Sequence, residues 1–428
     1  MEPVGKGPIT YEEAKQLSAR AAKVFQPRTP ITTQELFSGR WNELTTIADA
    51  VNQAGLHVVI YGERGVGKTS LANVVSPTIW ALDRRDPERP AGTPDRLVIK
   101  TVASGEDSFS SIWSKLFREL TWSNNRASAG FLPTQKDRLS IKTAFGLAEK
   151  VGVDEVRRVL SNMPGAVFII DEYDRAAKNT SREFTDLIKA LSDLAIDCTV
   201  VLIGVSDTID QLIADHASIN RALTQVFLPR MVADDLRKIL STAEQQLGVN
   251  FSLEAASIIV HVSQGLPHYT HLVGLNAVRT SALDHFQTYV ERDHVFEALK
   301  KSVRQAEQSV TNKYVKATHS SHKDALYRHV LLACALTATR HRDALGYFNP
   351  AAVIEPLGVV LDRKVTIATF NSHLSEFCQP ERGAVFERDG QARSYRFRFS
   401  DPLLVPFTFM DAVATGLISN DRLSALLE

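Results

Sequence analysis

Short apolar runs alternate with longer amphipathic segments over roughly residues 35–235 of the chain. The runs at 57–61, 96–102, 166–170 and 199–205 are largely continuous in apolar character and do not alternate with polar residues. Strands of this kind are typically buried on both faces, in a parallel sheet with helices on either side. The pattern therefore predicts an α/β domain. Within it, the segment 83–95 is expected to be a loop, and 121–150, which is harder to interpret, a helical insertion.

Beyond about residue 232 the apolar positions recur at helical spacing. Helices are predicted over 233–247, 253–263, 267–286 and 293–313. The polar run Thr318-His319-Ser320-Ser321-His322 then predicts a linker. At the other end of the chain, a capping-box sequence at Thr10 and Glu13 predicts a helix that ends near Phe25, before two prolines.

The last hundred residues predict a small mixed unit. Helices are expected over 329–338, 350–357 and 366–377, followed by a β-hairpin over 383–399 that turns at Asp389-Gly390. Three helices and a hairpin are typical of a winged-helix domain. The chain is thus expected to contain four parts: an N-terminal helical segment 1–34, an α/β core 35–231, a helical lid 232–317 and a winged-helix domain 318–428.

A phosphate-binding loop of the form G-x-x-x-x-G-K-[ST] directly follows the first predicted strand. Its residues are Gly62, Glu63, Arg64, Gly65, Val66, Gly67, Lys68 and Thr69, and Ser70 continues into a helix. Glycines allow backbone N–H groups to surround a phosphate, and the helix dipole favours its negative charge. Lys68 is expected to reach the β- and γ-phosphates of ATP, and the Thr69 hydroxyl to bind Mg²⁺.

An acidic pair ends the third predicted strand, in the sequence Ala166-Val167-Phe168-Ile169-Ile170-Asp171-Glu172. A phosphate loop needs a carboxylate that holds the metal shell and a second one that orients or deprotonates the attacking water. Asp171 is predicted to take the first role and Glu172 the second, which is catalytic.

With these motifs the sequence resembles the AAA+ class of P-loop ATPases over roughly residues 35–425, and within it the initiator-like branch related to origin-recognition ATPases. Asp171-Glu172-Tyr173-Asp174 resembles the D-E-x-D form of that branch. Leu36-Phe37-Ser38-Gly39-Arg40 resembles the segment that packs near the adenine, so the resemblance implies nucleotide contacts for Gly39 and Arg40. The implied fold is an AAA+ core with a helical lid and a C-terminal winged helix.

The resemblance also implies residues that sense or stabilise the γ-phosphate. The strand at 200–205 is similar to the sensor-1 strand, and Ser206 or Asp207 stands where the family usually has asparagine. The segment 216–231 resembles the arginine-finger region, with Arg221 as first candidate and Arg230 as second. Whether the finger acts on its own subunit or on a neighbouring one stays open.

The sequence departs from the initiator pattern at Gly265-Leu266-Pro267-His268. His268 occupies the place of the usual sensor-2 arginine, and Gly-Leu-Pro resembles the G-x-P motif of STAND signalling ATPases. That resemblance implies that Pro267 and His268 contact the nucleotide. A plain helix start with proline at its first position is the structural alternative.

Composition narrows the class of protein further. The 428 residues include 49 basic and 49 acidic side chains, so there is no overall positive field for nucleic acid, although a local patch remains open. Cys198, Cys334 and Cys378 form neither a metal nor a disulfide pattern, which suits a reducing compartment. No apolar stretch is long enough to span a membrane, and a cytoplasmic protein is expected.

Three functions follow as hypotheses. The first is an ATP-hydrolysing molecular switch, a homo-oligomer or a complex with a partner protein, whose nucleotide state controls the winged helix. The second is a DNA-loading initiator-type ATPase: the predicted third helix of the winged unit, 366–377, lacks Lys and Arg, but the hairpin carries Arg388, Arg393, Arg396 and Arg398. The third is a weakly hydrolysing, ATP-bound scaffold that regulates an effector, for example in defence.

Overall fold

The computed structural model describes residues 8–32, 37, 39–85, 96–125, 136–213, 218–322, 325–343, 345–391 and 394–427. The chain forms two compact units, which we call the sheet unit and the helical unit. The sheet unit comprises Ile31–Glu63 and Lys68–Pro229, and the helical unit comprises Met1–Pro30, Arg64–Gly67 and Arg230–Glu428. The tip of the phosphate-binding loop thus belongs to the helical unit, whereas its two ends belong to the sheet unit.

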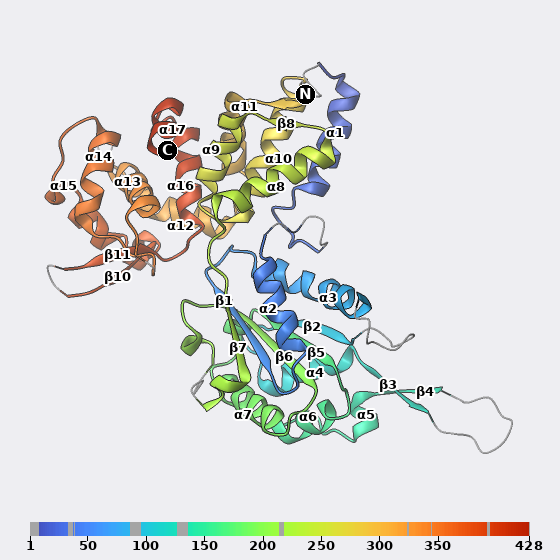
Figure 1. Cartoon of the computed structure of the whole chain (residues 1–428). Helices are drawn as coiled ribbons and strands as arrows, with labels where there is room; N and C mark the ends of the chain where they lie inside the picture. Colours follow the sequence, from blue (N-terminus) through green and yellow to red (C-terminus); the bar gives the residue numbers. More distant parts are fainter. Residues whose placement is uncertain are drawn as a thin grey trace. The chain divides into compact units, whose positions relative to one another are not determined.

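The sheet unit is built on a five-stranded parallel sheet (Figure 1). In spatial order the strands are β2 Val98–Val102, β5 Ala166–Asp171, β6 Cys198–Val205, β1 His57–Gly62 and β7 Leu223–Phe227. All four pairings are parallel. The four strands expected from the apolar runs are confirmed, and so is the α/β fold class. β1 and β5, which carry the phosphate loop and the acidic pair, both lie against β6.

Both faces of this sheet are buried, which explains the continuous apolar runs. Val59, Phe168 and Val200 belong to one hydrophobic cluster, together with side chains of α4 Phe109–Arg118, α6 Val153–Leu160 and α7 Thr180–Asp193. The alternate positions along the same strands, such as Val167 and Val201, are also fully buried and point to the other face. Helices α2 Trp41–Val51 and α3 Lys68–Arg85 contact β1.

The expected helical insertion at 121–150 is wrong. The structure has an antiparallel pair there, β3 Thr121–Asn125 with β4 Lys136–Ser140, followed by the short helix α5 Ile141–Phe145. Ser123, Asn124 and Asn125 have low helix propensity, because Ser and Asn side chains can form hydrogen bonds to the backbone in non-helical conformations. The predicted loop at 83–95 overlaps the end of α3, and its residues 86–95 lie outside the described part.

The helical unit begins with α1 Tyr11–Val24, which has the predicted capping box: the Thr10 N–H donates to Glu13 Oε2 at 2.8 Å, and the Glu13 N–H to Thr10 Oγ1 at 3.3 Å. The other elements follow in sequence: α8 Ala233–Leu247, β8 Asn250–Phe251, α9 Leu253–Ser263, α10 Pro267–Leu283, β9 Tyr289–Val290, α11 Arg292–Val303, α12 Gln308–Thr318, α13 Tyr327–Arg340, α14 Ile354–Leu361, α15 Ile367–Glu376, β10 Phe386–Asp389, β11 Arg396–Phe399, α16 Leu404–Ala414 and α17 Asn420–Leu427.

Two helices of this unit differ from expectation. The predicted helix 293–313 is two helices: α11 ends at Val303, and α12 begins after its N-cap Glu307, whose ψ of 134° is not helical. The predicted helix 350–357 is a 3₁₀ turn, Pro350–Val353, that continues into α14. α13, α14, α15 and the β10–β11 hairpin follow one another as expected. The lid and winged-helix boundaries remain predictions.

Within the described residues, every helix is too short or too polar to cross a bilayer.

Candidate nucleotide-binding site

The backbone of the phosphate-binding loop favours glycine at three positions, the two fixed glycines of the motif and one variable position. Gly62, Gly65 and Gly67 have φ values of 150°, 85° and 99°, which side-chain-bearing residues rarely adopt. A Cβ at Gly62 would stand 2.3 Å from the carbonyl oxygen of Leu228, on the chain leaving β7. The loop is therefore a tight backbone cradle between the end of β1 and the start of α3, the arrangement that receives phosphate groups.

Lys68, the first residue of α3, is buried inside this cradle with 8% of its surface exposed. Its Nζ donates to the carbonyl oxygens of Gly62 at 2.8 Å and Glu63 at 2.7 Å. Burial lowers the pKa of Lys68 from 10.5 to about 8, against the opposing influence of Asp174, Asp171 and Glu63. The ammonium thus pairs with neutral carbonyl oxygens, which are weaker partners for it than an anion is. A contact of Lys68 with phosphate stays a prediction.

The predicted metal ligand Asp171 ends β5, and its carboxylate is almost fully buried. Its Oδ1 accepts from the Glu172 N–H at 2.9 Å, and its Oδ2 lies 3.0 Å from Nζ of Lys100. Lys100 also donates to Asn73 Oδ1 at 2.8 Å. Thr69 and Asp171 supply the oxygen ligands that Mg²⁺ prefers, but the negative charge of Asp171 is already balanced by a lysine.

Sequence reasoning missed Lys100. The signal was present: a lysine in the middle of the apolar strand β2, which the strand register places opposite Ile169 on β5. A charged side chain on a strand adjacent to the one that ends in Asp171 is a natural partner for that carboxylate.

Glu172, the predicted catalytic residue, follows Asp171 in a left-handed backbone conformation with φ 53° and ψ 34°. A non-glycine residue in this region is uncommon and is often found at functional positions. The Glu172 carboxylate is 44% exposed and lies 2.6 Å from Nη1 of Arg175. Asp174, between them, accepts from the N–H of Val205 at 2.8 Å and so links this turn to the end of β6.

The two sensor candidates lie directly after β6. The Ser206 hydroxyl lies 2.8 Å from Gln211 Oε1 and accepts from the Thr208 N–H at 3.2 Å, so it belongs to a local turn. Its backbone N–H donates to the carbonyl of Gly62 at 3.4 Å, which brings this turn to the first residue of the phosphate loop. The N–H of Asp207 also donates to Gln211, at 3.2 Å. The γ-phosphate roles of Ser206 and Asp207 stay predictions.

The adenine-side candidates Gly39 and Arg40 both have positive φ, 71° and 65°, and Arg40 precedes α2. The Arg40 guanidinium is buried, donates to the carbonyl of Pro229 and lies 3.0 Å from Glu43. Arg40 thus has a structural role within the sheet unit, and its contact with a nucleotide stays a prediction.

The two finger candidates have protein partners. Arg221 is 79% exposed and lies 2.5 Å from Asp193, the last residue of α7. Arg230 donates to the Gln264 carbonyl at 3.2 Å. An exposed ion pair such as that of Arg221 contributes little stability and opens readily, so a finger role for Arg221 stays a prediction.

Pro267 and His268 begin α10, in the helical unit. Pro267 lies against the tip of the phosphate loop, since a Cβ at Gly67 would be 3.8 Å from its Cγ. Burial lowers the pKa of His268, with Arg64 acting in the same direction and Glu307 and a hydrogen bond to Pro27 opposing. The structure thus brings both predicted residues to the loop tip, while their nucleotide contacts remain predictions.

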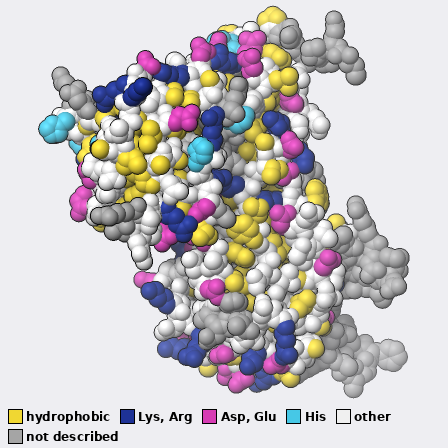
Figure 2. Space-filling model, turned by 60° about the vertical axis from the view of Figure 1, so that its left-hand side comes forward, with side chains coloured by type: hydrophobic (Ala, Val, Ile, Leu, Met, Phe, Trp, Pro, Cys, Tyr) yellow, Lys and Arg dark blue, Asp and Glu magenta, His cyan; other side chains and the backbone are white. Residues whose placement is uncertain are grey.

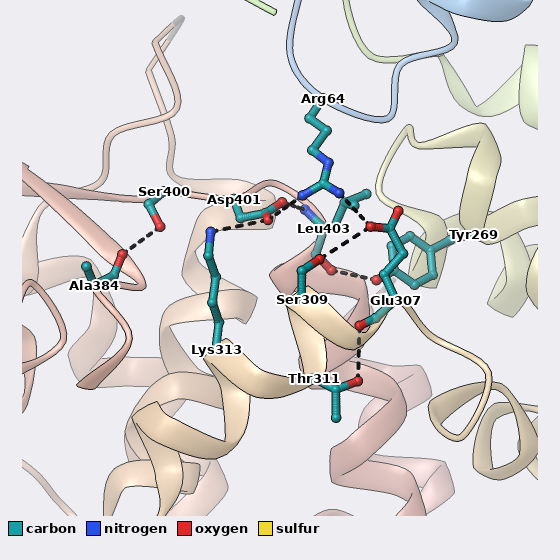
Figure 3. Close-up of polar contacts among 10 residues, drawn as sticks. All are labelled: Arg64, Tyr269, Glu307, Ser309, Thr311, Lys313, Ala384, Ser400, Asp401 and Leu403. Carbon is teal, nitrogen blue, oxygen red and sulfur yellow. Dashed lines mark hydrogen bonds and ion pairs between the residues drawn. The ribbon is translucent and has the colours of Figure 1, made fainter. Parts of the chain in front are cut away.

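The loop tip makes a further contact that the sequence did not indicate. Arg64 lies 2.5 Å from the carboxylate of Glu307 and 3.0 Å from that of Asp401 (Figure 3). These partners are 243 and 337 residues away along the chain. Sequence spacing gives no signal for contacts of this range.

The family model described as nSTAND1, Novel STAND NTPase 1, matches residues 27–344 of the chain. This match confirms the resemblance to STAND ATPases that rested on Gly265-Leu266-Pro267. No curated protein matches the sequence.

Several solved structures are similar to this chain. The ORC2 protein of Aeropyrum pernix (ADPNP–ADP complexes) is 13% identical with a TM-score of 0.48, covering 92% of this chain and 98% of that chain. The Walker-type ATPase of Pyrococcus abyssi is 13% identical with a TM-score of 0.48, covering 90% and 99%. Cdc6p of Pyrobaculum aerophilum is 14% identical with a TM-score of 0.45, covering 92% and 97%.

Proposed function

The chain belongs to the Novel STAND NTPase 1 family, and from this premise we propose that it is an ATP-hydrolysing molecular switch. In this proposal ATP binds at the loop 62–69 with Mg²⁺, and Glu172 acts on the attacking water. The nucleotide state then controls residues 318–428 and the engagement of a partner protein or of further copies of the chain.

The observation that carries the proposal is the buried ammonium of Lys68, held by the Gly62 and Glu63 carbonyls inside a loop that only glycine can build. A buried lysine whose direct partners are neutral carbonyl oxygens is costly for the folded state, and burial outweighs the opposing influence of Asp174 and Asp171. A phosphate group bound in the cradle would give the ammonium an anionic partner in direct contact. The arrangement therefore suits an anion of high charge, as the family's NTPase description requires.

Residues of the sheet unit would bind the metal ion and activate the attacking water. Thr69 and Asp171 would hold a magnesium ion, which neutralises charge on the phosphates when it is bound. Glu172 would orient and deprotonate a water molecule, for which its carboxylate must first leave Arg175. Asp174 would keep this turn fixed to β6 through its hydrogen bond to Val205.

Calorimetry and phosphate-release assays on the full chain test this proposal with two variants. Lys68→Ala should lose most of its affinity for Mg-ATP, because no other described side chain donates from inside the loop. Glu172→Gln should bind Mg-ATP at least as well as the wild type but release phosphate at least 100-fold more slowly, as expected for loss of a general base. Equal turnover of Glu172→Gln and wild type would refute the catalytic assignment.

A weakly hydrolysing scaffold is the second candidate, and one pair of contacts favours it. Both carboxylates of the acidic pair are held by cations: the predicted metal ligand Asp171 by Lys100 at 3.0 Å and the predicted catalytic Glu172 by Arg175 at 2.6 Å. In this reading ATP binding alone drives the switch. Partner control that survives in Glu172→Gln would support the scaffold, whereas its loss would support the hydrolysing switch.

DNA loading is less favoured by the charges of the hairpin. Arg396 lies 2.6 Å from Asp389 and 2.7 Å from Asp343, and Arg398 lies 2.6 Å from Glu387. Arginines that already have acidic partners offer little net charge to a phosphate backbone. On the face drawn in Figure 2, Lys and Arg side chains likewise stand among Asp and Glu side chains. Binding of DNA at low salt would restore the DNA hypothesis if a variant with the charge of Arg396 reversed no longer binds.

A further inference from the structure

The tip of the phosphate-binding loop is fastened to the C-terminal part of the chain. Arg64 donates through Nη2 to Glu307 Oε2 at 2.5 Å and through Nη1 to Asp401 Oδ2 at 3.0 Å (Figure 3). Both terminal nitrogens of the guanidinium are thus engaged by carboxylates. All three residues belong to the helical unit, which includes the loop tip Arg64–Gly67.

Asp401 is held firmly in place. Its side chain is 3% exposed, its Oδ2 also lies 3.4 Å from Nζ of Lys313, and its Oδ1 accepts from the Leu403 N–H at 3.2 Å. A buried carboxylate is stable only when it is paired and hydrogen-bonded. Asp401 therefore depends on Arg64 and Lys313 for its charge balance.

Glu307 reaches Arg64 because the chain breaks between α11 and α12. As the N-cap of α12, Glu307 uses its carbonyl to accept from the Thr311 N–H at 3.0 Å and hydroxyl at 3.2 Å. Its carboxylate accepts from Ser309 at 3.4 Å. A continuous helix over 293–313, as the sequence predicted, would lack this cap.

Apolar packing supports the ionic contact. The position of a Cβ on Gly65 would be only 2.9 Å from Cδ2 of Leu403, which leaves no room for a side chain on the loop. The Leu403 carbonyl accepts from the Tyr269 hydroxyl at 2.7 Å, and Tyr269 is itself buried in α10. The segment Asp401–Leu403 is thus fixed on one side to the loop and on the other to α10.

We propose that Glu307 and Asp401 form a clasp on Arg64 that competes with nucleotide for this arginine. The inference rests on nucleotide binding at the loop. Arg64 and Lys313 carry two positive charges and Glu307 and Asp401 two negative charges, so the clasped cluster is neutral and adds no attraction for a triphosphate. Nucleotide phosphates draw Arg64 away, and the segment 401–404, which leads into the first residue of α16, is released.

Because the clasp and the nucleotide compete for Arg64, each must weaken the other. If nucleotide weakens the clasp, then a weaker clasp must strengthen nucleotide binding by the same factor. Glu307 and Asp401 are therefore positioning residues that set nucleotide affinity through Arg64. Asp401→Asn keeps the acceptor for the Leu403 N–H and removes the charge, and it should tighten ATP binding roughly 5- to 10-fold, at the lower end of typical couplings.

Equilibrium binding of a fluorescent ATP analogue to the full chain tests the clasp in a double-mutant cycle of Arg64→Gln, Asp401→Asn and the double variant. Asp401→Asn should tighten binding in the wild type and have no effect when Arg64 is already Gln. Equal tightening in both backgrounds would indicate general electrostatics and overturn the clasp, and so would no tightening or weaker binding in a folded Asp401→Asn protein.

Two further variants keep the test decisive. Glu307→Gln should reproduce the tightening if Asp401→Asn fails to fold. Arg292→Gln removes the contact of Arg292 with Asp421, in the same unit but away from the loop, and should leave affinity unchanged. A comparable change in Arg292→Gln would overturn the assignment.

Hydrogen exchange distinguishes the clasp from a purely structural role of Asp401, because a structural role predicts no change in exchange when nucleotide binds. Saturating non-hydrolysable ATP analogue should accelerate exchange of the amides of 403 and 404, whose N–H groups donate to Asp401. Unchanged exchange in nucleotide-saturated wild type overturns the clasp while the proposed function stands. No nucleotide binding by the wild type at all overturns both.

Discussion

The buried ammonium of Lys68 makes nucleotide binding a proton-linked reaction. In the free protein its pKa is lowered by burial from 10.5 to about 8, so above this pH the side chain is mostly neutral. A triphosphate in the loop favours the charged form and raises the pKa again. Binding above pH 8 must therefore take up a proton, and ATP affinity must fall as the pH rises.

The size of the effect follows from these values. Between the pKa of Lys68 in the free protein and its pKa in the complex, each rise of one pH unit weakens the binding free energy of ATP by about 1.4 kcal/mol, or about tenfold in affinity. Affinity should be nearly constant between pH 6.5 and 7.5 and about tenfold weaker at pH 9. At pH 8.5 about three quarters of the free protein would carry a neutral Lys68, so binding should take up about 0.7 proton. A lysine at its ordinary pKa would show almost no change over this range.

Isothermal titration calorimetry in two buffers of different ionisation enthalpy measures this proton uptake directly. Lys68→Arg is the matched control, because a guanidinium stays charged throughout and its binding should take up no proton at pH 8.5. Wild-type affinity that stays constant from pH 7 to 9, without proton uptake, would refute the reasoning that burial in the loop lowers the pKa of Lys68.

Four other predictions give independent checks. Lys68→Met should raise the free energy of unfolding of the nucleotide-free protein by about 1 to 3 kcal/mol at pH 7 in chemical denaturation, because it removes a buried charge. The pKa of Lys68 is lower in the folded than in the unfolded protein, so wild-type stability should rise with pH from about 8 to 10.5. A wild-type stability that does not change over this pH range would contradict the prediction. Lys100→Met should lower the Mg²⁺ concentration for half-maximal ATP binding a few-fold by freeing Asp171, while Lys115→Met, which breaks the separate pair with Asp107, should not. Arg175→Ala should raise phosphate release by at most about fivefold, because its pair with Glu172 is exposed and weak, and slower release would show that Arg175 assists the reaction. A mixture of Arg221→Ala and Lys68→Ala proteins should regain turnover if Arg221 acts on a neighbouring subunit, whereas a mixture without recovery at any ratio would place Arg221 in its own site.

The sheet and the loop could be predicted from sequence because their signals are local. A continuous apolar run such as 166–170 reports burial on both faces, and the spacing of Gly62, Gly67 and Lys68 is set by the phosphate cradle itself. Asp171 and Glu172 were found in the same way, as the carboxylates that directly follow a buried strand. The capping box of Thr10 and Glu13 is another local signal, and the structure confirms it.

The ion pairs of the phosphate loop and of the acidic pair could not be predicted from the sequence, because they depend on tertiary structure. Lys100 forms an ion pair with Asp171 because β2 pairs with β5 in the sheet. Arg64 forms an ion pair with Asp401, which is 337 residues away along the chain. The break at Glu307 has no Pro or Gly to mark it. Helical periodicity continues through 293–313, whereas Glu307 at the break makes contacts that periodicity does not report, the N-cap of α12 and the ion pair with Arg64.

Binding of Mg-ATP to the purified full chain, measured beside Lys68→Ala under the same conditions, decides whether the loop 62–69 holds the nucleotide. We expect saturable one-site binding by the wild type at pH 7, and a loss of at least 100-fold in affinity for a variant that still unfolds in one cooperative thermal transition. Equal affinity of the two proteins, or no affinity of the wild type for ATP or ADP, would contradict it.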